Sequence, residues 1–134
     1  MEKTPNIPPS HGVGIDIVKI ERLKKLQHDS HFLNRIFFPE EIEMFDSSAN
    51  RLASLAARWA VKEAVAKALG CGFGPKLSFK DITIYYNDAG GPEVRLSPKA
   101  KEIHENPEIA VSISHDGEYS VAIAWIYRKG NKTS

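Results

Sequence analysis

The sequence predicts an α+β fold in which a mostly antiparallel sheet packs on a long central helix. Three observations predict it: a period-2 apolar alternation over residues 12–18, an alanine-rich helical stretch over residues 50–69, and two pairs of strand-like runs in the second half. A short glycine-containing turn joins each pair, which makes its strands antiparallel neighbours. A strand followed by helices and then by hairpins is typical of α+β proteins rather than of doubly wound sheets.

The chain has 134 residues, which suits one domain with a core of its own. We expect that domain over residues 12–127, with flexible tails over residues 1–11 and 128–134, because neither end carries a periodic apolar pattern. A hydrophobic content of 42% and a charged content of 26% place the chain among ordinary globular proteins.

The composition also excludes several classes of function. A formal net charge of +1 argues against a broad basic face for nucleic acid. The apolar runs are too short to span a membrane, and the polar, proline-rich start does not match a secretory signal. The single cysteine, Cys71, can neither form an internal disulfide framework nor complete a zinc-finger spacing. We therefore expect a cytoplasmic protein without structural zinc.

The first half of the body is expected to hold one strand and several helices. Residues 12–18 alternate as a strand does, and residues 20–27 place apolar side chains on one side of a short helix. Residues 38–46 carry a proline and then acidic residues at the start, the composition favoured in a first helical turn. The main helix is expected from about Asn50, which can serve as its N-cap, to Leu69, where a glycine follows as the stop.

The second half is expected to hold two hairpins with a short helical segment between them. The expected elements are strands at 81–87 and 92–97, one or two helical turns within 97–106, and strands at 110–115 and 119–126 that turn at Asp116 and Gly117.

Two carboxylates stand where an isolated charge is unexpected. Asp16 lies inside the first strand, and Glu63 falls within the apolar arc of the main helix that includes Leu55 and Trp59. A strand face that meets water would explain Asp16 by itself. An unpaired charge in apolar surroundings is costly, however, so Glu63 needs a partner. Together the two carboxylates could share a hard cation such as Mg²⁺, which favours oxygen ligands.

Three cations lie within five residues of Glu63 on the same helix. Lys67 follows Glu63 by four residues, so the two side chains share a face. This spacing leaves two interpretations open: a salt bridge of roughly a few tenths of a kcal/mol, or a contact with a phosphate held beside a metal. Arg58 and Lys62 flank the stripe, where they could be solvated, cover Trp59 with their stems, or gather positive charge for a polyanion.

Other motifs give weaker signals. The glycine-rich stretch at 70–74 leaves room for a ligand to approach the backbone, but it matches neither a Walker A motif nor a dinucleotide fingerprint. His115 lies at the tip of the last hairpin, where a structural role is the commoner one. Ser112 and Ser114 have no Ser-His-Asp context, which excludes a serine hydrolase.

Five stretches taken together resemble the holo-acyl-carrier-protein synthases, the small class of 4′-phosphopantetheinyl transferases. They are GVGIDIVKIERL, RIFFPEE, ARWAVKEAVAKALG, LSFKDI and VSISHDGEYSVAIAWI, and the likeness covers about residues 12–126. The early G-x-D strand, the W-x-x-K-E-A-x-x-K-A helix followed by glycine, and the S-I-S-H hairpin are specific in this order and spacing.

The resemblance implies the fold of these transferases and an active site built on Asp16, Glu63 and Lys67. The two carboxylates would bind Mg²⁺, which also holds the diphosphate of coenzyme A, and Lys67 would contact the same phosphates. The resemblance further implies a homotrimer whose active sites lie between neighbouring subunits.

The resemblance also implies binding roles for five other residues. Arg58 and His115 would hold the nucleotide end of coenzyme A, including its 3′-phosphate, and Gly72 would line the coenzyme A site from the glycine turn. Arg22 matches a position that meets the acidic acyl carrier protein, and the nearby Lys25 adds positive charge that would attract that partner.

The implied reaction is phosphopantetheinyl transfer, in which a serine hydroxyl of an acyl carrier protein attacks the β-phosphate of coenzyme A and releases adenosine 3′,5′-bisphosphate. Such a transfer depends chiefly on positioning and charge neutralisation. The serine proton would pass to Glu63 or to a water on the metal. Two other classes stay open: a metal-dependent phosphodiesterase or nuclease, and a non-catalytic module that binds coenzyme A or the carrier protein.

Overall fold

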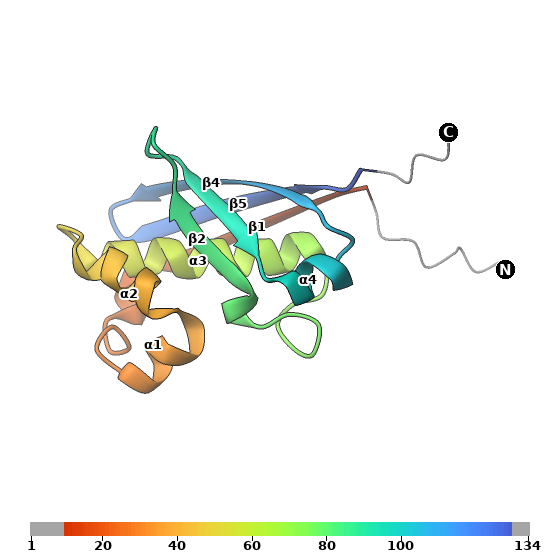
Figure 1. Cartoon of the computed structure of the whole chain (residues 1–134). Coiled ribbons are helices and arrows are strands. Elements are labelled where there is room, and N and C mark those ends of the chain that lie inside the picture. Colours follow the sequence, from red (N-terminus) through yellow and green to blue (C-terminus); the bar gives the residue numbers. More distant parts are fainter. Residues whose placement is uncertain (1–9, 130–134) are drawn as a thin grey trace, which may run out of the picture.

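The computed structural model describes residues 10–129 and shows one long helix between two layers (Figure 1). The elements in chain order are β1 (His11–Lys19), the 3-10 helix η1 (Ile20–Leu23), α1 (Ser30–Ile36), α2 (Pro39–Asp46), α3 (Arg51–Leu69), the 3-10 helix η2 (Phe79–Asp81), β2 (Ile82–Tyr86), β3 (Pro92–Leu96), α4 (Pro98–Ile103), β4 (Glu108–Asp116) and β5 (Tyr119–Tyr127). The predicted α+β fold with antiparallel sheets is confirmed.

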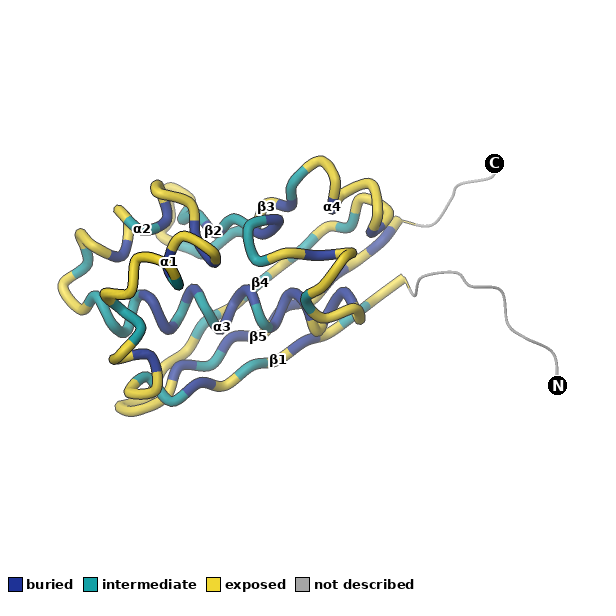
Figure 2. The backbone as a smooth tube through the Cα atoms, turned by 90° about the horizontal axis from the view of Figure 1, so that it is seen from below, coloured by how far each residue is buried: buried dark blue, intermediate teal, exposed yellow. Residues whose placement is uncertain are grey.

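Two antiparallel sheets surround the central helix. The larger sheet has the order β1-β5-β4, so the first strand pairs with the last, and the smaller sheet is the β2-β3 hairpin. Helix α3 lies between the larger sheet and a layer formed by α1, α2 and the β2-β3 hairpin (Figure 2). Buried residues consequently occur all around α3 rather than along one stripe.

The boundaries of α3 follow the capping signals in the sequence. Asn50 Oδ1 accepts a hydrogen bond of 3.0 Å from the Ala53 amide, which confirms Asn50 as the N-cap. Gly70 ends the helix with φ at 78°, a left-handed conformation that glycine adopts without steric cost. The predicted span of α3 is therefore correct.

Strand β1 lies unusually close to α3 because both present small residues at the contact. A Cβ atom added to Gly14 would lie 2.0 Å from the carbonyl oxygen of Ala64, and one added to Gly12 would lie 2.2 Å from that of Ala68. No side chain larger than hydrogen fits at either position. This contact explains why Ala64 and Ala68 are small, and it brings the neighbouring Asp16 against the helix.

The face of β1 that was expected to meet water packs on α3, and the isoleucine face is exposed. The strand turns Gly14, Asp16 and Val18 towards α3, whereas Ile15 and Ile17 are 58% and 63% exposed. The interpretation in which the Asp16 face meets water is thus wrong. An apolar face of the larger sheet is left uncovered in the single chain.

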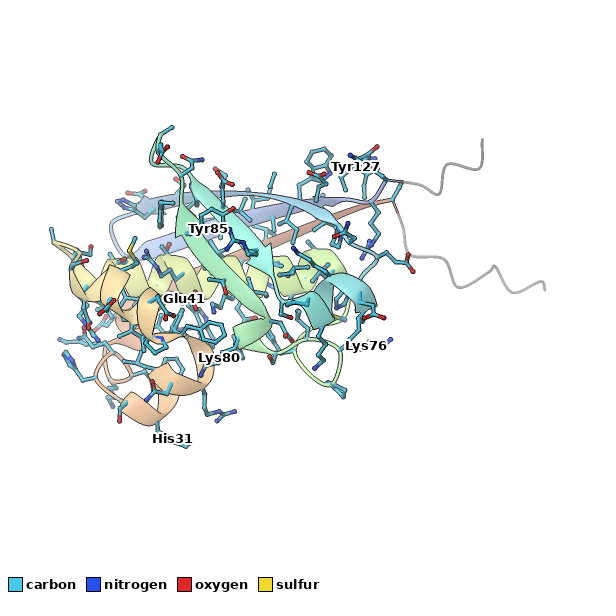
Figure 3. All side chains as sticks on the ribbon, viewed as in Figure 1. His31, Glu41, Lys76, Lys80, Tyr85 and Tyr127 are labelled. Carbon is cyan, nitrogen blue, oxygen red and sulfur yellow. The ribbon has the colours of Figure 1, made fainter. Side chains whose placement is uncertain are left out.

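A buried ion pair ties the second layer to α3. Lys62 is fully buried and donates to Glu41 Oε1 at 3.1 Å and to the carbonyl oxygens of Ile36 and Phe79 at 2.8 and 3.1 Å. Glu41 lies on α2 beside the central helix (Figure 3), and its other oxygen accepts from the Ile84 amide. A solvated Lys62 beside the apolar stripe is therefore a wrong expectation.

Several boundaries differ from the sequence-based expectation. Helix α1, capped by Asp29, was not expected, and residues 20–27 form a single 3-10 turn followed by turns rather than a helix. The last hairpin turns at Gly117 and Glu118, one residue later than predicted, because Asp116 still pairs with Tyr119.

The folded body also extends slightly beyond the expected residues 12–127 at both ends. His11, expected in the N-terminal tail, is the first residue of β1. Arg128, expected in the C-terminal tail, is buried and donates to the carbonyl oxygen of His104 at 2.9 Å. The remaining residues of the two expected tails, 1–9 and 130–134, lie outside the described residues.

Candidate active site

The central contact of the site joins β1 to the last part of α3. Lys67 Nζ lies 3.1 Å from Asp16 Oδ1 and donates to the carbonyl oxygen of Ile15 at 2.9 Å. The Asp16 side chain is only 15% exposed, whereas that of Lys67 is 53% exposed. The close approach of β1 to α3 thus places a strand carboxylate against a helix ammonium that lies 51 positions away in the chain.

Glu63 belongs to the same cluster. Burial raises the pKa of its carboxyl group, the charge of Asp16 raises it further, and Lys67 acts in the opposite direction. The two carboxylates are therefore close enough to repel each other, and Lys67 compensates part of that repulsion. The structure brings Asp16, Glu63 and Lys67 together on the face of α3 that meets β1.

This donor set suits a hard divalent cation. Asp16 and Glu63 offer carboxylate oxygens, the ligands that Mg²⁺ prefers, and a cation between them would relieve their mutual repulsion. Across residues 10–129 no group of three or more His, Cys, Asp or Glu side chains gathers around one point. A site with two protein ligands leaves coordination positions for water and substrate phosphate, which is the usual arrangement for Mg²⁺.

Arg58 lies on a different side of α3. The residue is 3% exposed, and its guanidinium stacks over the Tyr86 ring of β2 at 5.1 Å and donates to Ser54 Oγ. Burial lowers its pKa, while Tyr86 and Glu41 act in the opposite direction. Arg58 Nε is buried without a partner among the described residues. An unused buried donor is costly, so this position favours an additional acceptor.

His115 is exposed near the end of β4, where it pairs in register with Ser120 of β5. Within residues 10–129 no hydrogen bond or ion pair joins Arg58 or His115 to the Asp16 cluster. The hydrogen bonds and ion pairs of the described chain therefore do not connect Arg58 or His115 to Asp16, Glu63 or Lys67.

The glycine turn follows α3 directly. Gly72 has φ at 63°, and an added Cβ there would meet nothing within 4 Å, so the turn is open to solvent. Residues 70–76 line a shallow pocket of their own. Cys71 Sγ lies 4.0 Å from His104 Nε2, and burial raises the pKa of this thiol, which does not suit a reactive nucleophile.

Positive charge gathers on the segment after β1. Arg22 and Lys25 are both exposed, on η1 and the turn that follows it. Lys24 and His28 are also exposed there, and His31 points away from the body on the adjacent α1 (Figure 3). The segment forms an exposed basic surface.

Comparisons with known proteins bear directly on this arrangement. A sequence profile described as the 4′-phosphopantetheinyl transferase superfamily matches residues 12–124. The chain belongs to this superfamily. The resemblance noted in the sequence is therefore confirmed.

Similar proteins of this superfamily are named holo-[acyl-carrier-protein] synthase. The chain is 40% identical over 116 residues to the one from a Sulfurovum species, covering 85% of this chain and 94% of that relative. It is 42% identical over 120 residues to the one from Aquifex aeolicus, covering 87% of this chain and 98% of the relative.

Solved structures of the superfamily share the fold. The Helicobacter pylori holo-[acyl-carrier-protein] synthase in complex with coenzyme A matches with a TM-score of 0.76 and 36% identity over 84% of this chain and 96% of its own. The Neisseria meningitidis synthase matches with a TM-score of 0.80 and 31% identity over 87% of this chain and 98% of its own.

Sequence reasoning missed two features of the surroundings. Glu41 was not identified as the partner of Lys62, and Tyr86 was not identified as the partner of Arg58. Neither pairing leaves a local pattern, because the partners come from α2 and β2. The only available signal was a pair of cations beside an apolar stripe, which has several explanations.

Proposed function

We propose that this chain transfers the 4′-phosphopantetheine group from coenzyme A to a serine of apo-acyl carrier protein in an Mg²⁺-dependent reaction. The single observation that carries the proposal is the cluster of Asp16, Glu63 and Lys67 in a member of the superfamily. Relatives about 40% identical bear the name of the synthase, and one similar structure holds coenzyme A.

The reaction is a displacement at phosphorus. The serine oxygen forms a bond to the β-phosphorus, the bond from that phosphorus to the α-phosphate oxygen breaks, and adenosine 3′,5′-bisphosphate leaves. Mg²⁺ bound by Asp16 and Glu63 would supply neutralisation of the diphosphate charge. Lys67 would bind the same phosphates, and the serine proton would pass to Glu63 or to a water at the site.

The substrate needs contacts that this cluster does not provide. Arg58 and His115 would bind the 3′-phosphate end of coenzyme A, and the unused Arg58 Nε supports this role. Because no hydrogen bond or ion pair joins these residues to the Asp16 cluster within the described chain, we place them on a neighbouring subunit. We also assign Gly72 to the coenzyme A site, and Arg22 and Lys25 to attraction of the acidic carrier protein.

The uncovered sheet face supports such an assembly. Val13, Ile15, Ile17, Ile123 and Trp125 project from β1 and β5, and each is between 43% and 63% exposed. Trp125 is opposite Val13 and Ile123 opposite Ile15, so these side chains form one continuous apolar surface. A patch of this kind marks an interaction site, and we propose that it joins the subunits of a homotrimer.

Mass spectrometry tests the proposed reaction. The protein is incubated with Mg²⁺, coenzyme A and apo-acyl carrier protein, and the carrier is weighed, with the Asp16→Asn variant as control. A mass gain of one phosphopantetheine with the wild-type chain alone supports the proposal. Unchanged carrier with measurable coenzyme A binding would indicate a non-catalytic module, and cleavage of added nucleic acid would indicate a nuclease.

One further assignment, the location of the enzyme, goes with this function. None of the helices in the described part of the chain is both long and apolar enough to cross a bilayer. Because the single cysteine suits a reducing compartment, we place the enzyme in the cytoplasm.

A further inference from the structure

Lys67 binds the carboxylate that the proposed metal requires. Its ammonium lies 3.1 Å from Asp16 Oδ1 and 2.9 Å from the carbonyl oxygen of Ile15, so two of its three donors point into the cluster. Asp16 is largely buried and close to Glu63, and the ammonium compensates charge that would otherwise be expensive there. Lys67 thus neutralises part of the carboxylate charge that a divalent cation would neutralise.

A lysine ammonium and a divalent cation repel each other when both bind the same carboxylate. A metal bridging Asp16 and Glu63 would lie beside the Lys67 ammonium, and like charges in a partly desolvated site repel strongly. The lysine is able to leave, because its side chain is 53% exposed on a flexible four-carbon stem. Asp16 cannot move in the same way, because β1 is held against α3 by the Gly14 contact.

We propose that Lys67 is a displaceable counter-ion: divalent metal releases its ammonium from Asp16, and the released ammonium then binds the diphosphate of coenzyme A. This inference rests on the proposed function. Metal alone must displace Lys67 and therefore binds weakly, whereas coenzyme A provides new acceptors for the released ammonium. Metal and coenzyme A consequently bind with positive cooperativity, and by linkage each raises the affinity for the other by the same factor.

The inference assigns Lys67 a role beyond a contact with phosphate. A lysine that only contacted phosphate would leave metal affinity in the absence of coenzyme A unchanged when it is removed. A counter-ion on Asp16 must instead weaken metal binding to the free enzyme. The two roles therefore differ in a measurement that involves no substrate.

Calorimetric titration with Mg²⁺ in the absence of coenzyme A tests this difference. Replacement of Lys67 by methionine is expected to tighten Mg²⁺ binding on the order of tenfold and to reduce the cooperativity with coenzyme A. Lys129→Met removes the same charge from an exposed pair with Glu108 and is expected to leave both quantities unchanged. Unchanged or weaker Mg²⁺ binding by Lys67→Met would overturn the proposal.

Chemical acetylation of the wild-type chain provides a second test that needs no variant. The rate at which Lys67 is acetylated is followed by peptide mass spectrometry with no addition, with Mg²⁺, and with Mg²⁺ plus desulfo-coenzyme A, which lacks the competing thiol. Displacement predicts a faster rate with Mg²⁺ and protection once the diphosphate is present. A rate unaffected by Mg²⁺ would mean that Lys67 stays on Asp16, against the proposal.

Neither measurement involves the carrier protein or the transfer itself. Failure of the carrier to gain mass, with displacement intact, would therefore overturn the proposed function alone. Transfer without displacement would overturn only the present inference.

Discussion

Lys62 and Glu63 are adjacent in the chain, yet they face opposite layers of the molecule. The Lys62 ammonium is fully buried against Glu41 of α2, whereas the Glu63 carboxylate lies on the β1 side of α3 near Asp16. Two adjacent side chains of α3 therefore have different roles: Lys62 holds the second layer, and Glu63 belongs to the candidate active site. Substitutions at these two positions should accordingly affect different properties.

Replacement of Glu63 by glutamine is expected to abolish Mg²⁺-dependent transfer and to stabilise the free chain at neutral pH. Glu63 has a raised pKa, so above the ordinary value near 4.5 the folded chain holds a proton at this position that the unfolded chain has lost. The contribution of Glu63 to the free energy of unfolding therefore falls as the pH rises above that value. Glutamine does not ionise and avoids this loss. Thermal unfolding with a chelator should show a higher Tm for Glu63→Gln at pH 7 and a smaller difference at pH 4. A lower Tm at pH 7 would contradict this account.

Replacement of Lys62 by methionine is expected to cost about 3–5 kcal/mol of unfolding free energy, because it leaves Glu41 buried without its cation. The double variant Lys62→Met/Glu41→Met removes both charges and should lose less. Chemical denaturation of the two variants and the wild type measures the difference. Equal losses in the single and double variants would show that the pair itself is unimportant.

Lys62 also makes the free energy of unfolding depend on pH in the alkaline range. Burial lowers the pKa of Lys62 to about 8 in the folded chain, although Glu41 acts in the opposite direction, against an ordinary value of 10.5. Between these values the unfolded chain binds more protons at this position, so the contribution of Lys62 to stability rises with pH. The free-energy difference between wild type and Lys62→Met should therefore widen from pH 8 to pH 10.

Alanine at position 14 tests the close packing of β1 on α3. The added Cβ would lie 2.0 Å from the carbonyl oxygen of Ala64 and 2.6 Å from the amide of Ala68, and neither backbone atom can yield easily. We expect Gly14→Ala to destabilise the chain by about 3 kcal/mol or more in urea unfolding. Gly74→Ala is the matched control, because its Cβ would meet nothing within 4 Å and should cost under about 0.5 kcal/mol.

Reversal of charge at Arg22 tests the basic surface. This side chain is exposed and is not one of the three residues of the Asp16 cluster, so Arg22→Glu should raise the KM for the acidic carrier protein far more than the KM for coenzyme A. Steady-state kinetics at two salt concentrations measures both constants, and the defect should shrink at high salt. An equal rise in both KM values would argue against docking at this surface.

Mixing of two inactive variants tests whether sites are shared between subunits. Asp16→Asn removes a residue of the carboxylate cluster, and Arg58→Met removes one that we assign to the neighbouring subunit. If sites form between chains, denaturing and refolding the two variants together should restore part of the activity, because some sites then receive both intact residues. Ile15→Asp on the apolar sheet face should abolish the assembly in analytical ultracentrifugation. Full activity from a monomeric Ile15→Asp chain would contradict the shared site.

Local signals account for what the sequence predicted correctly. The span of α3 followed from Asn50 and Gly70, which act within one helical turn, and the shared face of Glu63 and Lys67 followed from their spacing. Alternation in β1 revealed two faces but not which one is covered, because that depends on Gly14 meeting α3. The burial of Lys62 was likewise invisible, since its partners are supplied by α2, η2 and the end of α1.

The pairing of β1 with β5 has a consequence for biosynthesis. Lys19 is opposite Tyr119 and His11 is opposite Tyr127, and among the described strands β1 hydrogen-bonds only with β5. During translation Asp16 is synthesised well before β5, so β1 lacks its hydrogen-bonded neighbour strand until β5 has formed. Contacts this distant along the chain form slowly. The nascent chain therefore holds Asp16 stably beside Glu63 and Lys67 only after β5 has been synthesised.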